Sequence, residues 1–112
     1  MNSDKKEMLA RTGDSSKEAI AARLKAARTM TRTSQGDLGK AVGVKNAAIS
    51  NMESARSFVT IDVMRHFHRE HRIDFNFFIA GLYSQLPEDV QELLFDALDS
   101  ADRAAGPEAS SD

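Results

Sequence analysis

The chain has 112 residues, of which 17 are acidic and 15 are Lys or Arg, and it contains no cysteine. This length suffices for one small hydrophobic core, so we expect a single domain with short tails. The lack of cysteine excludes a disulfide framework, a thiolate zinc site and a cysteine nucleophile. No apolar run approaches the length of a membrane span, and the first residues lack the apolar region of a signal peptide. We therefore expect a cytoplasmic protein.

The net charge of −2 is the balance of two opposed segments. Residues 84–112 hold one Arg against eight acids, a net of −7. Residues 17–56 hold three acids and eight cations, a net of +5, the cations being Lys17, Arg23, Lys25, Arg28, Arg32, Lys40, Lys45 and Arg56. A basic segment favours phosphate binding, whereas DNA repels an acidic one. The charges thus fit a nucleic-acid partner at one end of the molecule only.

Residues 1–14 are polar, mixed in charge and without a sustained period, so we expect a flexible N-terminal arm. A helix is predicted to follow from about Ser16 to Thr29, with Ser15 and Glu18 at the spacing of a capping box. Its buried stripe would be Ile20, Leu24 and Ala27.

Two short helices, joined at Gly43, are predicted in the centre of the chain. Ser34 caps the first, with Asp37 three residues later, and Gly43 supplies the left-handed residue that ends it. Gly39 removes a side chain where another helix would need close approach. The second helix begins by Asn46 and ends near Glu53.

The second of these helices has a short polar face. Ile49 and Met52 would point inward, which leaves on the outer face Lys45, Asn46, Ala47, Ser50 and Asn51. Such a face suits the floor of a DNA major groove, where amide side chains can pair with base edges.

This central run resembles the Cro/repressor-type (XRE) helix-turn-helix family. The shared features are Ser34-Gln35, Leu38, Gly39, Gly43-Val44, Ile49-Ser50 and Glu53. The resemblance extends over about residues 17–81 and implies an all-α, five-helix lambda-repressor-like DNA-binding domain, which we place at residues 15–83. Three positions depart from the family: Lys45 stands at the usual Ser or Thr cap, Ser54-Ala55 where glycine is common, and Arg32-Thr33 in place of Gly-Leu.

The resemblance also implies a function and its residues. We expect a sequence-specific transcriptional regulator, a repressor that binds double-stranded DNA at a pseudo-palindromic operator. Its base contacts would be Lys45, Asn46, Ala47, Ser50 and Asn51. Its phosphate contacts would be Arg28, Gln35, Ser54 and Arg56. An ion pair between Arg28 and Glu53 is expected to join the first helix of the domain to the second of the two central helices, the one that would read DNA bases.

Two further helices are predicted, capped by Thr60 and Asp74. Their aromatic residues are expected in the core: Phe67, Phe75, Phe77 and Phe78. Of the histidines, His68 and His71 would share a helix face, but no cysteine or acid cluster completes a metal site around them and His66. Because the chain also lacks a nucleophile motif and a phosphate-binding loop, we expect neither a cofactor nor an enzyme.

A last helix is predicted within residues 84–103, opened by Pro87 in its first turn. Its apolar stripe is Val90, Leu93, Leu94, Ala97 and Leu98. We expect this stripe to form a homodimer interface, because two half-sites on DNA require a two-fold dimer. The alternative is that it folds back on the aromatic helix that begins at Asp74. Residues 104–112 are expected to be a disordered acidic tail.

Two other functions fit the same sequence. In the first, the domain is an antitoxin that binds DNA with one face and a toxin with the acidic tail. In the second, it is a protein-interaction adaptor without DNA binding. The two outward-facing asparagines favour a DNA-binding regulator over the adaptor.

Overall fold

Seven helices and their connections account for the part of the chain that the computed structural model describes, which is residues 1–110, with side chains to residue 105. The helices are α1 Ser3–Ala10, α2 Lys17–Met30, α3 Gln35–Val42, α4 Asn46–Glu53, α5 Ile61–His71, α6 Phe75–Ala80 and α7 Glu88–Ser110. The prediction of an all-α protein is confirmed for these residues. None of these helices combines the length and the apolar character that crossing a membrane requires.

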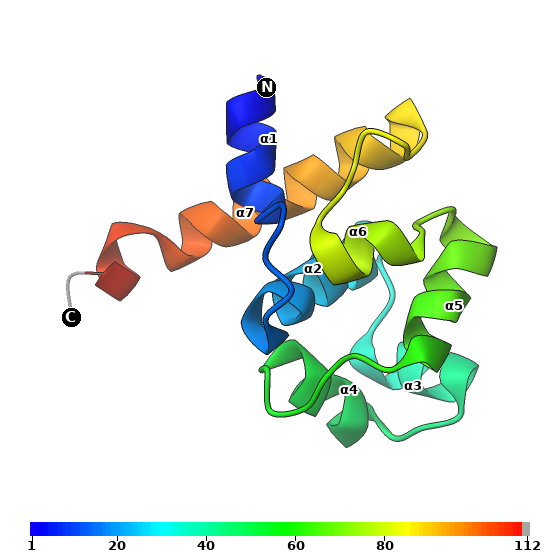
Figure 1. Ribbon diagram of the computed structural model, residues 1–112. Coiled ribbons are helices and arrows are strands. Elements are labelled where there is room, and N and C mark those ends of the chain that lie inside the picture. The colour runs from blue at the N-terminus through cyan, green and yellow to red at the C-terminus, as the bar shows by residue number, and fades with distance from the viewer. Residues whose placement is uncertain (111–112) are drawn as a thin grey trace.

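Helix α2 lies at the centre of the arrangement (Figure 1). Helices α7, α4 and α6 all pack on α2, and α1 packs on α7. The pair α3 and α4 lies on one side of α2, and α7 crosses the other side with its C-terminal end projecting beyond the body (Figure 1). The largest fully buried apolar side chains include Leu24, Phe67, Phe77 and Phe78, whereas Phe75 is only partly buried.

The predicted caps set the starts of three helices. The side chains of Ser34 and Asp74 accept hydrogen bonds of 3.0 Å from the backbone N–H groups of Asp37 and Phe77, respectively. Thr60 caps α5 in the same way. The cap of α2 lies one residue later than predicted, because Ser16, and not Ser15, accepts from the N–H of Ala19. Ser15 instead donates to the carbonyl of Ile79.

The expected flexible N-terminal arm is wrong for residues 3–10, which form α1. Asn2 caps this helix by accepting a 2.8 Å hydrogen bond from the N–H of Lys5. Leu9 and Ala10 are buried, and α1 lies against α7. Tertiary contacts thus stabilise a helix that has too few apolar residues to show a periodic pattern.

The stripe on α7 is mostly core, which corrects the predicted dimer interface. Val90, Leu94 and Leu98 are at most 5% exposed within the single chain, so they are not available to a second copy. Leu93 remains 51% exposed, and Ala97 is partly buried.

The alternative docking site for this stripe is also wrong, because α7 packs mainly on α2 and α1 rather than on α6. The backbone of α7 is helical as far as Ser110, beyond the predicted end at residue 103. The expectation of a disordered tail therefore fails for residues 104–110, and residues 111–112 lie outside the described part.

Arg23 connects three helices from inside the core. Arg23 is 1% exposed. Although it is one of the eight cations of residues 17–56, it is therefore not available to bind phosphate. Its guanidinium donates to five backbone carbonyls within 3.3 Å, those of Ala10, Arg11, Asp14, Phe78 and Ile79. The carbonyl of Asp14 belongs to the turn between α1 and α2. The other four lie at the C-terminal ends of α1 and α6, where carbonyl groups lack helical partners and carry partial negative charge.

Gly81 completes the environment of Arg23. It has a left-handed backbone with φ of 68°, and a Cβ atom there would lie 2.5 Å from the carbonyl oxygen of Ala10 and 2.8 Å from Nη2 of Arg23. Only glycine permits this approach. Burial lowers the pKa of Arg23 to about 10, which leaves the guanidinium charged at neutral pH and able to donate all five N–H groups.

We predict that Arg23→Met lowers the free energy of unfolding by about 3 kcal/mol or more, because buried carbonyls would lose their donors. Arg23→Lys should also destabilise, since an ammonium supplies three donors and no planar fork. Urea denaturation measures both. Arg65→Met is the control: Arg65 is exposed and pairs only with Asp62, so its loss should cost less than about 1 kcal/mol. Equal effects of Arg23→Met and Arg65→Met would contradict this role.

Candidate nucleic-acid interface

Helices α3 and α4 meet at a bare glycine. A Cβ atom on Gly39 would lie 2.6 Å from the carbonyl oxygen of Val44, so the side chain that Gly39 lacks is what lets the helices approach. Gly43 ends α3 with φ of 79°, and the N–H of Val44 donates to the carbonyl of Gly39 at 2.8 Å. The bounds of α3 and α4 agree with those predicted, and the turn between them is short and fixed.

The outer face of α4 is polar and available. Ile49 and Met52 are buried beneath it, and every residue predicted as a base contact is exposed, namely Lys45, Asn46, Ala47, Ser50 and Asn51. Within the described residues, no side-chain hydrogen bond involves the amides of Asn46 and Asn51 or the hydroxyl of Ser50. Their donors and acceptors are therefore free for an external partner.

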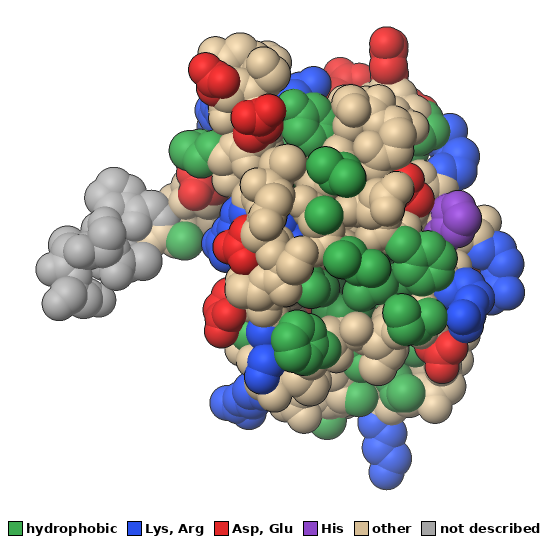
Figure 2. Space-filling model, in the orientation of Figure 1, with side chains coloured by type: hydrophobic (Ala, Val, Ile, Leu, Met, Phe, Trp, Pro, Cys, Tyr) green, Lys and Arg blue, Asp and Glu red, His purple; other side chains and the backbone are tan. Residues whose placement is uncertain are grey.

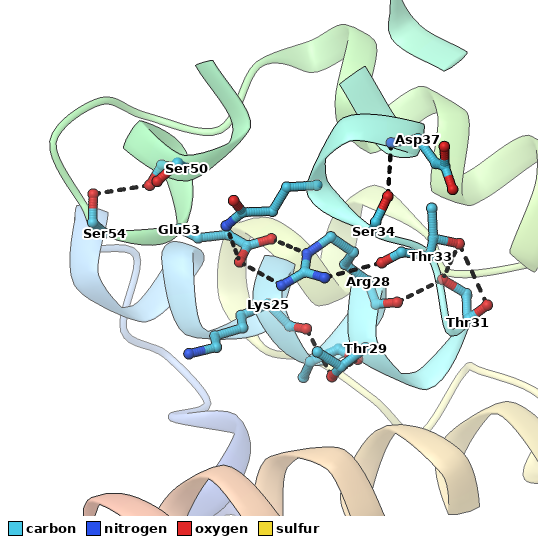
Figure 3. Close-up of polar contacts among 12 residues, drawn as sticks. Lys25, Arg28, Thr29, Thr31, Thr33, Ser34, Asp37, Ser50, Glu53 and Ser54 are labelled. Carbon is cyan, nitrogen blue, oxygen red and sulfur yellow. Dashed lines mark hydrogen bonds and ion pairs between the residues drawn. The ribbon is translucent and has the colours of Figure 1, made fainter. Parts of the chain in front are cut away.

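The predicted ion pair between Arg28 and Glu53 is present (Figure 3). Nε and Nη2 of Arg28 donate to the two carboxylate oxygens of Glu53, a bidentate arrangement. Nη1 donates to the carbonyl of Thr33 at 2.9 Å. The side chains of Arg28 and Glu53 are 14% and 5% exposed. One guanidinium thus joins α2, the residue before the cap of α3, and the last residue of α4.

The other predicted phosphate contacts differ in how far they are available. Nε2 of Gln35 donates to Glu53 at 3.2 Å, which leaves its second amide N–H free. Arg56 is exposed and forms no ion pair within the described side chains. Ser54 is different: its hydroxyl donates to the carbonyl of Ser50 at 2.9 Å. Because a hydroxyl has one proton, a hydrogen bond from Ser54 to a phosphate would have to replace the one to Ser50; the phosphate contact of Ser54 stays a prediction.

Two of the positions at which the sequence departs from the helix-turn-helix pattern have a left-handed backbone. Arg32 and Ala55 have φ of 56° and 62°, the left-handed region that costs a residue with a Cβ roughly 1–2 kcal/mol. Lys45 occupies the N-cap of α4 but makes no side-chain cap hydrogen bond. The turns before α3 and after α4 therefore carry some cost in stability, and the first N–H groups of α4 lack a side-chain acceptor.

Charge is distributed unevenly over the surface (Figure 2). In the orientation of Figure 1, Lys and Arg side chains project from the lower part, where α3 and α4 lie, whereas acidic side chains are most frequent near the top and along the left side. Lys40, Lys45 and Arg56 are exposed. Helix α7, on the other side of α2, begins with Glu88 and Asp89. The exposed cations around α3 and α4 thus lie on a different side of α2 from the acidic start of α7.

The histidines lie together on α5 but do not form a metal cluster in the described residues. The rings of His66 and His71 are 5.7 Å apart, a contact that the predicted sharing of a helix face by His68 and His71 did not include. His68 lies beside Phe75. Burial lowers the pKa of His71, and the nearby His66 lowers it further. These contacts show packing of the imidazoles against aromatic residues.

Comparison of the chain with protein-family models, with curated proteins and with solved structures finds no match. A function for this chain is therefore inferred from the geometry of α3 and α4 and from the side chains that these helices expose.

We predict that Arg28 and Glu53 behave as one unit in stability. Arg28→Met and Glu53→Gln should each destabilise, because either change leaves a largely buried charge without its partner. The double variant should lose less than the sum, with a coupling free energy of about 1–3 kcal/mol from urea denaturation. The exposed pair Arg65 and Asp62 is the matched control and should couple by less than about 1 kcal/mol. Strict additivity at Arg28 and Glu53 would refute the pair's role.

Proposed function

We propose that this protein is a sequence-specific DNA-binding transcriptional regulator in which α3 and α4 act as a helix-turn-helix. The observation on which this depends is the outer face of α4. It carries two asparagines and a serine with free hydrogen-bonding groups, on a helix fixed to α2 by Arg28 and Glu53. A rigid, polar and mildly basic helix face fits the major groove, which admits one α-helix.

In this proposal the side chains divide by role. The amides of Asn46 and Asn51 each pair with the N6 and N7 edge of an adenine, and the methyl group of Ala47 contacts a thymine methyl. Arg56 and the free N–H of Gln35 bind phosphates and fix the register of α4 in the groove. Arg28 holds α4 in place, and any contact between its remaining N–H groups and phosphate is secondary because the side chain is 14% exposed.

The first test requires a binding site, which selection from random duplex DNA supplies. On the selected site, Asn46→Ala or Asn51→Ala should weaken binding by about 1–3 kcal/mol and leave binding to random DNA unchanged, as measured by fluorescence anisotropy. Asn76→Ala, at an exposed asparagine on α6, is the matched control and should have no effect. Equal losses on selected and random DNA would show that Asn46 and Asn51 do not recognise bases.

Failure to enrich any sequence would refute the proposal as a whole. The protein-interaction adaptor would then be the better interpretation. An antitoxin would enrich a site and, in addition, form a complex with a toxin encoded beside it.

The second test concerns salt. Because Lys and Arg displace counterions from phosphates, we expect the binding constant to fall steeply between about 50 mM and 200 mM salt. Arg56→Ala should weaken binding to all sequences and reduce the slope by about one unit. Arg103→Ala is the control, since Arg103 lies on α7 and pairs with Asp99. A binding constant that does not change with salt would contradict phosphate contacts.

A further inference from the structure

A groove between α2 and α7 remains open after the chain has folded. It has a volume of about 760 Å³, and its apolar lining includes Ala26, Met30, Leu93, Ala97 and Ala101. Leu93 is 51% exposed, although it lies in the middle of a helix whose other large apolar residues are buried. Lys25 and Thr29 lie on the side of α2 nearest to α7, the orange helix at the bottom of Figure 3. The groove thus combines an exposed leucine with a floor of small side chains.

The two walls of the groove carry opposite charges. Lys25 of α2 and Arg32, which follows the end of α2, belong to one wall, and Asp96 belongs to the α7 wall. Among the described side chains, these three form no ion pair. Elsewhere on α7, Asp89 and Asp99 do pair, with Arg72 and with Lys5 and Arg103. These three exposed charges are therefore available for ion pairs with groups from outside the chain.

We propose that the groove binds a second copy of this chain, with α7 of one protomer lying antiparallel against α7 of its partner. In a two-fold dimer a surface must be complementary to itself. This groove meets that condition, because rotation places the acidic α7 wall of one protomer against the basic α2 wall of the other. Leu93 of each protomer inserts between the small side chains of its partner, as a knob into a hole. Asp96 then faces Lys25 of the partner.

This dimer uses a different face of α7 from the one predicted from the sequence. The stripe of Val90, Leu94 and Leu98 is core, and the seam moves to Leu93 and Ala97, which are one turn apart. Small residues at Ala97 and Ala101 allow two helices to approach closely. We favour a second copy over an unrelated protein because the charges on the two walls are complementary to each other, as a two-fold dimer requires. The dimer does not itself rest on the proposed function. Its use in spanning two half-sites does.

Analytical ultracentrifugation of the full chain tests the seam. At about 50 µM we expect the wild type to sediment as a dimer and Leu93→Glu as a folded monomer, with a dimer Kd higher by about 100-fold or more. Leu82→Glu is the matched control, because Leu82 is 45% exposed but does not line this groove; this variant should stay dimeric. Circular dichroism should show unchanged helicity in both, since each leucine is half exposed. The Tm of Leu93→Glu should match that of the wild type only at concentrations where the wild type is monomeric, because dimerisation raises Tm. A monomeric wild type, or a dimeric Leu93→Glu, would overturn the proposal.

Exchanging the charges of Asp96 and Lys25 tests the same dimer without changing Leu93, in case Leu93→Glu does not fold. Asp96→Lys should weaken the dimer, because the introduced ammonium group would face Lys25 of the partner. Adding Lys25→Asp should restore dimerisation to within about tenfold of wild type. If the double variant is no better than Asp96→Lys alone, the two residues do not meet and the proposed arrangement is wrong.

DNA binding separates the failure of this dimer from the failure of the proposed function. Leu93→Glu should bind a single half-site with wild-type affinity and bind a two-half-site operator about 100-fold more weakly than the wild type. If a wild-type monomer still binds a selected half-site, only the dimer is refuted. If neither site is bound, the proposed function fails and sedimentation alone decides on the dimer.

Discussion

The fold depends on one buried cation. Arg23 donates to five carbonyls from α1, the turn after it and α6, and each of these acceptors is a backbone group. The C-terminal ends of two helices, where carbonyls lack helical partners, thus converge on one guanidinium. Its attraction to the negative ends of two helices offsets part of the cost of burying a charge. Arg23 thus holds both α1 and α6 to α2. Helix α7 then packs on a surface that α1 and α2 form together.

Helix α2 presents a second guanidinium five residues later, which serves the other side of the molecule. Arg28 binds Glu53 at the end of α4 and the carbonyl of Thr33 before α3. The two arginines differ in environment. Arg23 is satisfied by backbone carbonyls, and Arg28 by a carboxylate at the edge of the proposed DNA surface. Helix α2 therefore holds α1 and α6 through Arg23 and holds α4, the proposed DNA-reading helix, through Arg28.

The sequence predicted most accurately what depends on local chemistry. Ser34, Thr60 and Asp74 act through hydrogen bonds within three residues, so α3, α5 and α6 begin where expected. Glycine at positions 39 and 43 determines the turn between α3 and α4 by sterics alone. The outward face of α4 follows from helical spacing once Ile49 and Met52 point inward.

What the sequence missed depends on contacts between distant residues. The helix α1 has only Leu9 and Ala10 to bury, too few to show a period, and it is stabilised by the distant α7. Whether the α7 stripe meets α1 and α2 or another chain is decided by the shape of the rest of the molecule. Arg23 offered a clue: it lies three residues after Ile20, on the apolar face of α2. A cation at such a position indicates a buried hydrogen-bonding role.

Whether α4 contacts DNA bases can be measured by an NMR titration of the ¹⁵N-labelled protein with a duplex obtained by selection. We expect the side-chain amide resonances of Asn46 and Asn51 to shift, together with backbone amides at the start of α3 and near Arg56, while the side-chain amide of Asn76 on α6 does not. Shifts confined to α6 or α7, or no difference between the selected duplex and a scrambled one, would contradict base recognition by α4.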